Sequence, residues 1–174
     1  MNKSPYNNKH FPEKIFSDDI TDWVFLSFDE IFRKDVLLRL KDFCLKIGRD
    51  KIIIKNIKPT EYNFFEEVWV KDIPEGLHNV VYSEHLTDYV SIPMSFAQLT
   101  EEGIIYGDET FSPFCLYFIR NYTLAILGAK GINVKEEFKE FQIEDLGDFL
   151  TLTFVERKPT EEFYKIVKEH WTTV

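Results

Sequence analysis

The sequence lacks the short motifs in which many enzymes display their catalytic or nucleotide-binding residues. Its 174 residues contain no GxSxG, no HExxH and no GxxxxGKS/T pattern. Glycine is scarce, with 7 copies, and the glycines of LGAKGI are too few and wrongly placed for a dinucleotide-binding loop. These absences argue against the commonest serine hydrolases, zinc proteases and P-loop nucleotide hydrolases, and they imply no bound cofactor.

Cysteine is equally scarce, with 2 copies in the chain. Cys44 lies in KDFCLKI and Cys115 in SPFCLYFI, with no CxxC or Cys/His spacing. Apolar surroundings are typical of a buried thiol, whereas a reactive thiol needs an electropositive and partly exposed setting. We therefore predict two buried free thiols, no metal site and a reducing, cytoplasmic location.

Long apolar runs and an excess of basic residues are also missing. No window approaches about eighteen uninterrupted apolar residues, and the first stretch, MNKSPYNNKHFPEK, lacks the apolar core of a signal peptide. The chain has 30 acidic and 21 basic residues, a net charge of −9. Because affinity for phosphate backbones comes from Lys and Arg, this balance disfavours nucleic acid as a partner. The missing apolar runs disfavour a membrane.

Apolar and aromatic residues are abundant instead. Hydrophobic residues make up 44% of the chain and aromatics 16%, which favours a packed core over disorder. The length fits one domain. Residues 1–26 begin as a polar arm with Pro5 and Pro12 and turn apolar at ITDWVFL. We expect this arm to lie over the surface of a single domain formed by residues 27–174.

Residues 28–47 carry the clearest helical pattern. Ser27 and Glu30 form a capping box at the start, and Gly48 stands where a C′ glycine would end the helix. Acidic residues precede basic ones by four positions, as before Arg39, which is the favourable order on a solvated face. The other face is apolar at spacings of three and four, through Phe28, Phe32, Val36, Leu40, Phe43 and Ile47.

Residues 114–127 are predicted to form a β-hairpin. Its arms, FCLYFI and YTLAIL, are separated by Arg120-Asn121, where the asparagine can take left-handed turn geometry. Both faces of the arms are apolar, so we expect a central hairpin with something packed on each side. Together with the long helix and a C-terminal helix at 161–171, this predicts an α+β domain with a mainly antiparallel sheet. A parallel α/β arrangement is the alternative, because a strand at 51–57 directly follows the long helix.

Weaker patterns predict the remaining elements. Capping residues and glycines delimit short helices, and β-branched runs indicate strands. The stretch EYNFFEEVW is ambiguous, and we favour a helix at 61–67 over a strand ending in VWV. The other expected elements are strands at 77–82 and 149–156 and helices at 96–102 and 133–141.

The tetrapeptide KPTE occurs twice, at 58–61 and 158–161. In each copy the proline ends a strand, the threonine (Thr60 or Thr160) offers an N-cap oxygen, and the glutamate lies in the first helical turn. Beyond these four letters the two stretches do not align, whereas true repeats are self-similar at a fixed period. We interpret KPTE as a helix-start signal that occurs twice independently, and not as a duplicated functional element.

One grouping of residues suits acid–base chemistry. Glu84, His85 and Asp88 place an imidazole between two carboxylates, which could move a proton or contribute to a metal site. Their spacing matches no established metal motif. A small hydrolase or ligand-binding enzyme with a site around these residues is therefore an alternative function.

The densest charge lies between Lys135 and Asp148. Only Lys135 and Lys139 oppose the acidic residues there, while Phe138 and its apolar neighbours take the inward positions. Such a run is a solvated face in many proteins, and the other interpretation is a docking surface for a basic protein partner. The candidate partner-binding residues are Glu136, Glu137, Glu140, Glu144, Asp145 and Asp148.

In size, acidity and aromatic content the chain is similar to bacterial immunity-type proteins, which neutralise a partner toxin. This similarity implies a small α+β protein without an active site. We accordingly expect a non-enzymatic, cytoplasmic binding protein, of immunity or regulatory type, that docks a basic protein. A structural subunit of a larger assembly is a third possibility.

Overall fold

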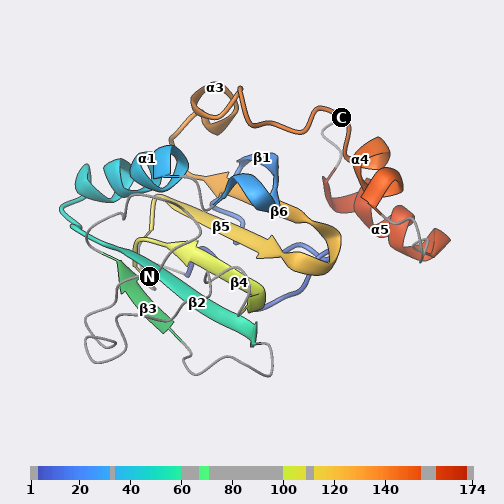
Figure 1. Cartoon of the computed structure of the whole chain (residues 1–174), viewed down its shortest axis with the longest axis horizontal. Helices are drawn as coiled ribbons and strands as arrows, with labels where there is room; N and C mark the ends of the chain where they lie inside the picture. The colour runs from blue at the N-terminus through green and yellow to red at the C-terminus, as the bar shows by residue number, and fades with distance from the viewer. Residues whose placement is uncertain are drawn as a thin grey trace.

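A single antiparallel sheet organises the chain. The computed structural model describes residues 4–31, 34–59, 67–70, 100–108, 112–153 and 160–171. The strands in these ranges are β1 (Asp22–Ser27), β2 (Ile52–Pro59), β3 (Glu67–Val70), β4 (Thr100–Tyr106), β5 (Phe114–Ile119) and β6 (Leu124–Ala129). They form one six-stranded sheet in the order β1-β6-β5-β4-β2-β3, and every neighbouring pair is antiparallel (Figure 1). The α+β prediction is confirmed, and the parallel alternative is wrong for the described strands.

Strands β5 and β6 form an interior hairpin that is buried on both faces. All residues of both strands are buried, and the register runs from Phe114 opposite Ala129 to Ile119 opposite Leu124. Because side chains alternate along a strand, Leu116 faces one core and Tyr117 the other. The two faces of the hairpin thus belong to two separate core clusters.

The turn of this hairpin differs from the prediction. Residues Arg120–Tyr122 form the 3-10 turn η3, and β6 begins only at Leu124. Thr123, not Asn121, takes the left-handed conformation, with φ of 50°, and its amide donates to the carbonyl of Arg120 at 2.9 Å. The loop is therefore longer than the two-residue turn that the Arg120-Asn121 pair suggested.

Helix α1 (Lys34–Leu45) covers one face of the sheet. Val36, Leu40 and Phe43 pack there in a core with Leu116 and Phe118 of the hairpin. The helix ends at Leu45, two residues before the predicted end at 47. Gly48 has the left-handed φ expected of a glycine that follows a helix, +76°, and its amide donates to the Leu45 carbonyl at 3.0 Å.

The predicted start of this helix at residue 28 is wrong. Ser27 is the last residue of β1, paired with Leu124, and its side chain makes no capping bond. The amide of Phe28 donates to the carbonyl of Thr123 at 2.8 Å, and Phe28–Glu30 form the 3-10 turn η1. The backbone of Ser27 and Phe28 is thus hydrogen-bonded to its neighbours in the sheet, so it cannot form the start of a helix as the capping box predicted. Helix α1 begins at Lys34.

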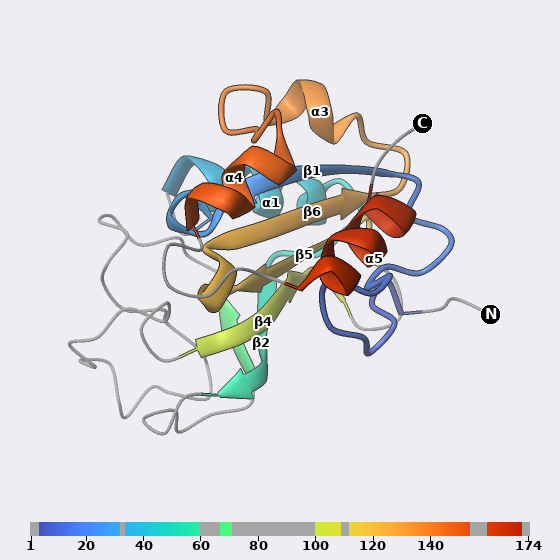
Figure 2. The same ribbon diagram turned by 90° about the vertical axis from the view of Figure 1, so that its right-hand side faces the viewer.

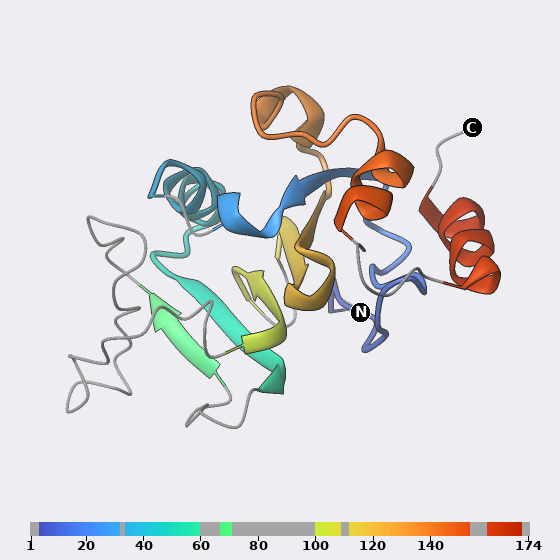
Figure 3. The ribbon, with the colours of Figure 1, turned by 45° about the vertical axis from the view of Figure 1, so that its right-hand side comes forward.

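The N-terminal segment, residues 4–20, and helix α5 (Glu161–Trp171) cover the opposite face. Figure 3 shows α1 and α5 on opposite sides of the sheet, and Figure 2 shows α5 beside the N-terminal segment. Phe11 and Phe16 pack against the ring of Trp171, with centroids 6.0 and 5.8 Å away, and the indole Nε1 donates to the Pro12 carbonyl at 2.7 Å. The expected arm therefore supplies core residues, and 22–26 of it belong to β1.

The bounds of α5 agree with the predicted helix at 161–171. The amide of Phe163 donates to Thr160 Oγ1 at 3.2 Å, so the second KPTE does begin a helix through its threonine. In the first copy, Lys58 and Pro59 close β2, and Thr60 lies outside the described residues. None of the helices in the described ranges has the length and apolar character needed to span a bilayer.

Three weaker predictions fail in the described residues. The expected strand at 149–156 is helical through Thr153, in α4 (Leu146–Thr153), because Asp145 caps that helix by accepting from the Asp148 amide at 2.9 Å. The expected helix at 96–102 gives way at Thr100 to β4, which pairs with β2 and β5. Strand β3 includes Glu67, the end of the favoured helix at 61–67, and it supports the alternative strand at VWV.

The helix expected at 133–141 is present but short. It is α3 (Val134–Glu137), and Asn133 caps it by accepting from the Glu136 amide at 3.2 Å. The strand predicted at 51–57 is β2, which extends to Pro59. The strand expected at 77–82 lies outside the described residues.

Gly128 sets how closely the N-terminal segment approaches the sheet, and replacing it tests this packing. A Cβ there would meet Ile20 Cγ2 at 2.5 Å and the Phe16 ring at 2.7 Å. We expect Gly128→Ala to lower the free energy of unfolding by about 1–3 kcal/mol in urea denaturation, through overpacking. Gly147→Ala is the milder comparison, since the atom that its Cβ would meet is Asp145 Oδ1 at 3.3 Å, the end of an exposed side chain, and alanine favours the helix. Equal stability of both variants would contradict the packing.

Candidate functional site

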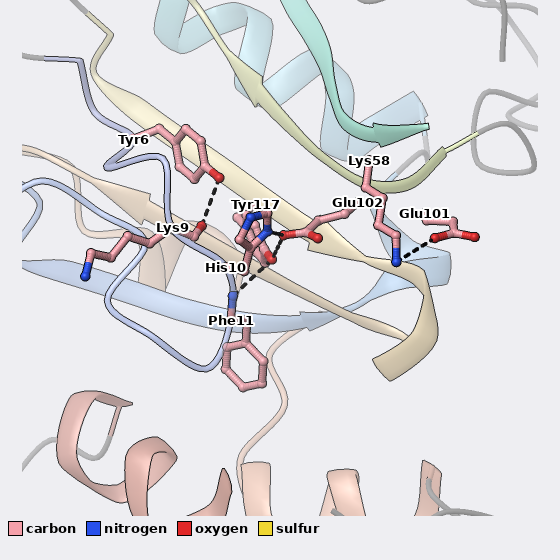
Figure 4. A network of polar contacts seen from close by, with 8 residues as sticks. All are labelled: Tyr6, Lys9, His10, Phe11, Lys58, Glu101, Glu102 and Tyr117. Atoms are coloured by element: carbon pink, nitrogen blue, oxygen red, sulfur yellow. Dashed lines mark hydrogen bonds and ion pairs between the residues drawn. The ribbon is translucent and has the colours of Figure 1, made fainter. Parts of the chain in front are cut away.

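The most site-like arrangement of side chains surrounds a buried carboxylate, Glu102 of β4. Only 6% of its side-chain surface is exposed, although a buried charge is costly unless it is paired and hydrogen-bonded. Tyr117 donates its phenol hydrogen to Glu102 Oε1, and His10 Nδ1 lies 2.7 Å from the same oxygen. Figure 4 shows these side chains pointing toward one another from three parts of the chain. The cluster of His10, Glu102 and Tyr117 is called the Glu102 cluster below.

Strand pairing and the N-terminal segment bring the Glu102 cluster together. Glu102 lies opposite Ile119 on β5, so Tyr117 is its diagonal neighbour on the same face of the sheet. The backbone amide of Phe11 donates to the Tyr117 hydroxyl at 3.1 Å, which fixes the residue next to His10. This further hydrogen bond orients the Tyr117 hydroxyl and holds the backbone next to His10.

The tyrosines around Glu102 serve as neutral donors. Burial raises the pKa of Tyr117, and its hydrogen bond to Glu102 raises this pKa further. Burial also raises the pKa of Tyr6 and of Tyr122, and the charge of Glu102 adds to each effect. Tyr6 donates its hydroxyl to the Lys9 carbonyl at 2.8 Å. The phenols thus stay protonated, and none of them can act as a base at neutral pH.

His10 is the member of the cluster that meets solvent. Its side chain is 63% exposed, while Nδ1 is held by the carboxylate. An imidazole oriented in this way can exchange a proton with solvent at its other nitrogen. In the described part of the chain no three His, Cys, Asp or Glu side chains are grouped closely enough to hold a metal ion.

The acidic segment, residues 136–148, presents all six of its predicted carboxylates to solvent. Glu136 and Glu137 lie on α3, Glu140 to Asp145 on the connection, and Asp148 on α4. Glu136 pairs with Lys139 at 2.7 Å, and Glu140 pairs with Arg39 of α1. Of these six carboxylates, those of Glu137, Glu144, Asp145 and Asp148 make no ion pair with a described residue.

Two anchors hold the acidic segment against the domain. The Arg39 guanidinium lies over the rings of Phe138 and Phe141, 5.5 and 5.4 Å from their centroids, and donates to the Glu137 carbonyl. At the other end, the Ile143 amide donates to the Phe25 carbonyl of β1 at 2.8 Å. The backbone that carries the carboxylates is therefore held in place by contacts with both α1 and β1.

The pair between Arg39 and Glu140 favours the charged form of each group. Its hydrogen bond raises the pKa of Arg39 and lowers the pKa of Glu140. The sequence suggested that Arg39 belongs to a solvated charge ladder along its own helix. The structure shows that it also reaches across to a segment about a hundred residues later in the chain.

The two cysteines are free and buried, as predicted. Burial raises the pKa of the Cys44 thiol to about 12, and it raises the pKa of the Cys115 thiol as well. Neither thiol is ionised at neutral pH, so neither has the character of a nucleophile. Glu84, His85 and Asp88 lie outside the described residues, and a site around them stays a prediction.

No family model, curated protein or solved structure matches this chain. Its function must therefore be argued from its own residues.

Sequence reasoning overlooked the Glu102 cluster. His10 was assigned to a polar arm, and Glu102 to a helix at 96–102. A signal was present in TEEGIIY, where Glu102, Ile104 and Tyr106 recur at the spacing of two that places them on one face of a strand. Recognising that strand would have placed a carboxylate among core residues, and such a carboxylate requires partners.

Arg39 can be tested as an anchor of the acidic segment. Arg39→Lys keeps the charge but loses the planar fork that stacks on two rings and bonds two acceptors. We expect it to lower the free energy of unfolding by about 1 kcal/mol, the scale of cation–π contacts near a surface. Arg49→Lys is the control, because Arg49 makes an ion pair with Asp108 at 3.1 Å without such ring contacts in the described residues and should change stability by less than about 0.5 kcal/mol. An effect of Arg39→Lys no larger than the control's would argue against the anchor.

Proposed function

We propose that this chain is a non-enzymatic binding protein that docks a basic protein partner on the acidic segment. The observation that carries the proposal is the exposure of all six carboxylates on a backbone held at both ends. A solvated charge run needs no such anchoring. A preformed docking surface benefits from it, because less ordering has to accompany association.

The charge balance supports the same proposal. Glu137, Glu144, Asp145 and Asp148 have no ion pair among the described residues, so they remain available to an incoming cation. The net charge of −9 gives the whole molecule a field that attracts a basic protein from a distance. Complementary charge of this kind raises the association rate and excludes acidic competitors.

The proposed partner is a basic protein, and the proposed setting is the cytoplasm. The similarity in composition to immunity-type proteins supports an inhibitory or regulatory role, in which the chain covers a basic surface of its target. The raised thiol pKa values and the neutral tyrosines support a binding role over nucleophilic catalysis in the described residues.

Charge reversal on the acidic segment tests the docking surface. The variant carries Glu137→Lys and Glu144→Lys, because neither carboxylate makes an ion pair with a described basic residue. Glu140 is left intact because it holds Arg39. The control carries Asp29→Lys and Glu169→Lys at exposed positions elsewhere, with the same change in net charge.

We expect the segment variant to associate about tenfold more slowly than wild type with a partner captured on the wild-type protein from its source cells. The difference should be seen at about 0.02 M salt and shrink beyond about 0.15 M, where screening shortens the field. The control should lose much less. Equal association rates for the segment variant and the control across the salt series would refute the acidic surface as the docking site.

A further inference from the structure

Residues 4–16 of the N-terminal segment cross the sheet as a strap over β4 and β5. The ring of Tyr6 stacks on that of Tyr117, with centroids 6.3 Å apart, and Phe11 is buried among aromatic rings. These contacts are apolar or between neutral groups, and they do not respond to pH in the neutral range. The contact between His10 and Glu102 is different, because it joins two ionisable groups.

This contact combines a buried carboxylate with an imidazole that solvent can reach. Glu102 is removed from water, so an unpaired charge on it would be costly. Tyr117 supplies one hydrogen bond but no positive charge. His10 can supply both, and its ring is open to protons from solution.

The other charged and titratable groups described near Glu102 do not supply the positive charge that His10 can supply. Tyr117 faces it from β5, Tyr6 from the strap and Tyr122 from η3, and the pKa of each phenol is raised. The pair of Lys58 with Glu101, 3.1 Å apart between β2 and β4, lies beside the cluster in Figure 4. Lys58 is drawn toward Glu101, so among the described residues the basic group bonded to Glu102 is that of His10.

We infer that the charge on His10 controls how firmly residues 4–12 are held on the sheet, so that His10 and Glu102 act as a proton-dependent latch. A protonated imidazole attracts the buried carboxylate, and a neutral one leaves only a hydrogen bond. Histidine side chains generally change charge between about pH 5 and pH 8. Local opening of the strap should therefore become more frequent as pH rises through this interval.

Opening of the strap would uncover Tyr117 and the adjoining aromatic surface without unfolding the sheet. Local openings of this kind are far less costly than global unfolding. The latch contains no residue of the acidic segment, so it is independent of the proposed docking function. It would make access to the second face of the sheet depend on pH.

Amide hydrogen exchange at Phe11 reports the latch directly, because this N–H donates to Tyr117 within the strap. Exchange is measured by NMR on the full chain between about pH 5.5 and pH 8 and corrected for the intrinsic, base-catalysed rate. We expect the protection factor of the Phe11 amide to fall about threefold to tenfold across this range. The amide of Ile126 in β6 monitors global stability in the same sample.

Three variants separate a latch from a general effect of pH. His10→Asn retains a side-chain N–H donor but cannot become charged, so the protection of Phe11 should lose its pH dependence. Glu102→Gln should behave likewise if it folds, and His10→Asn suffices if it does not, since His10 is exposed. His170→Asn, on α5 next to Trp171, is the matched control and should keep the wild-type slope.

A wild-type protection factor at Phe11 that stays constant with pH would overturn the latch. Retention of the wild-type slope in His10→Asn would overturn it as well. In either case the Glu102 cluster would be a fixed anchor of the strap, whose strength does not depend on the charge of the imidazole.

Discussion

The structure depends on the burial of the β5–β6 hairpin on both of its faces. Every side chain of these strands is removed from solvent, so each face of the sheet needs a separate covering layer. Helix α1 covers one face, and the N-terminal segment with α5 covers the other. Burial of this many large apolar groups is the main favourable term in folding. The ends of the chain are thereby drawn into the core, and Trp171 meets Pro12 across the whole length of the sequence.

The polar features of the molecule lie at the margins of this double core. Among the described residues, Glu102 is the carboxylate buried in the core, and its hydrogen-bonding partners connect the strap to the sheet. The acidic segment lies outside the core and is fixed to it by Arg39 and by the edge of β1. Both features combine an exposed charged group with a rigid support. This combination is what the proposed binding role requires, because a rigid support reduces the ordering that has to accompany association.

Local signals predicted those parts of the fold that local interactions decide. The helix at 161–171 follows from its Thr160 cap and apolar face, and Gly48 ends α1 because only a left-handed residue suits that position. The predictions failed where distant pairing overrides the local pattern. Ser27 has the sequence pattern of a helix N-cap, but it pairs with β6 as the last residue of β1. Thr100 begins strand β4, because this strand pairs with β2 on one side and with β5 on the other.

The two candidate sites show the same contrast. The acidic segment is contiguous, so its six carboxylates could be read directly from the sequence, and the structure adds the anchors that hold them. The Glu102 cluster joins residues 92 positions apart, and no local pattern connects His10 to Glu102. Tyr117 is likewise brought beside Glu102 only by the register of β4 and β5. Sequence reasoning could have found the buried carboxylate through its strand periodicity, but not its partners.

If the acidic segment is a preformed surface, its backbone is already rigid in the free protein. We expect ¹⁵N relaxation of residues 136–148 to yield order parameters near 0.85, the value typical of rigid backbone. The amides of β5 provide the rigid reference within the same molecule. Order parameters below about 0.6 across the segment would show a flexible acidic tether, and they would contradict a surface held ready by Arg39 and Phe25.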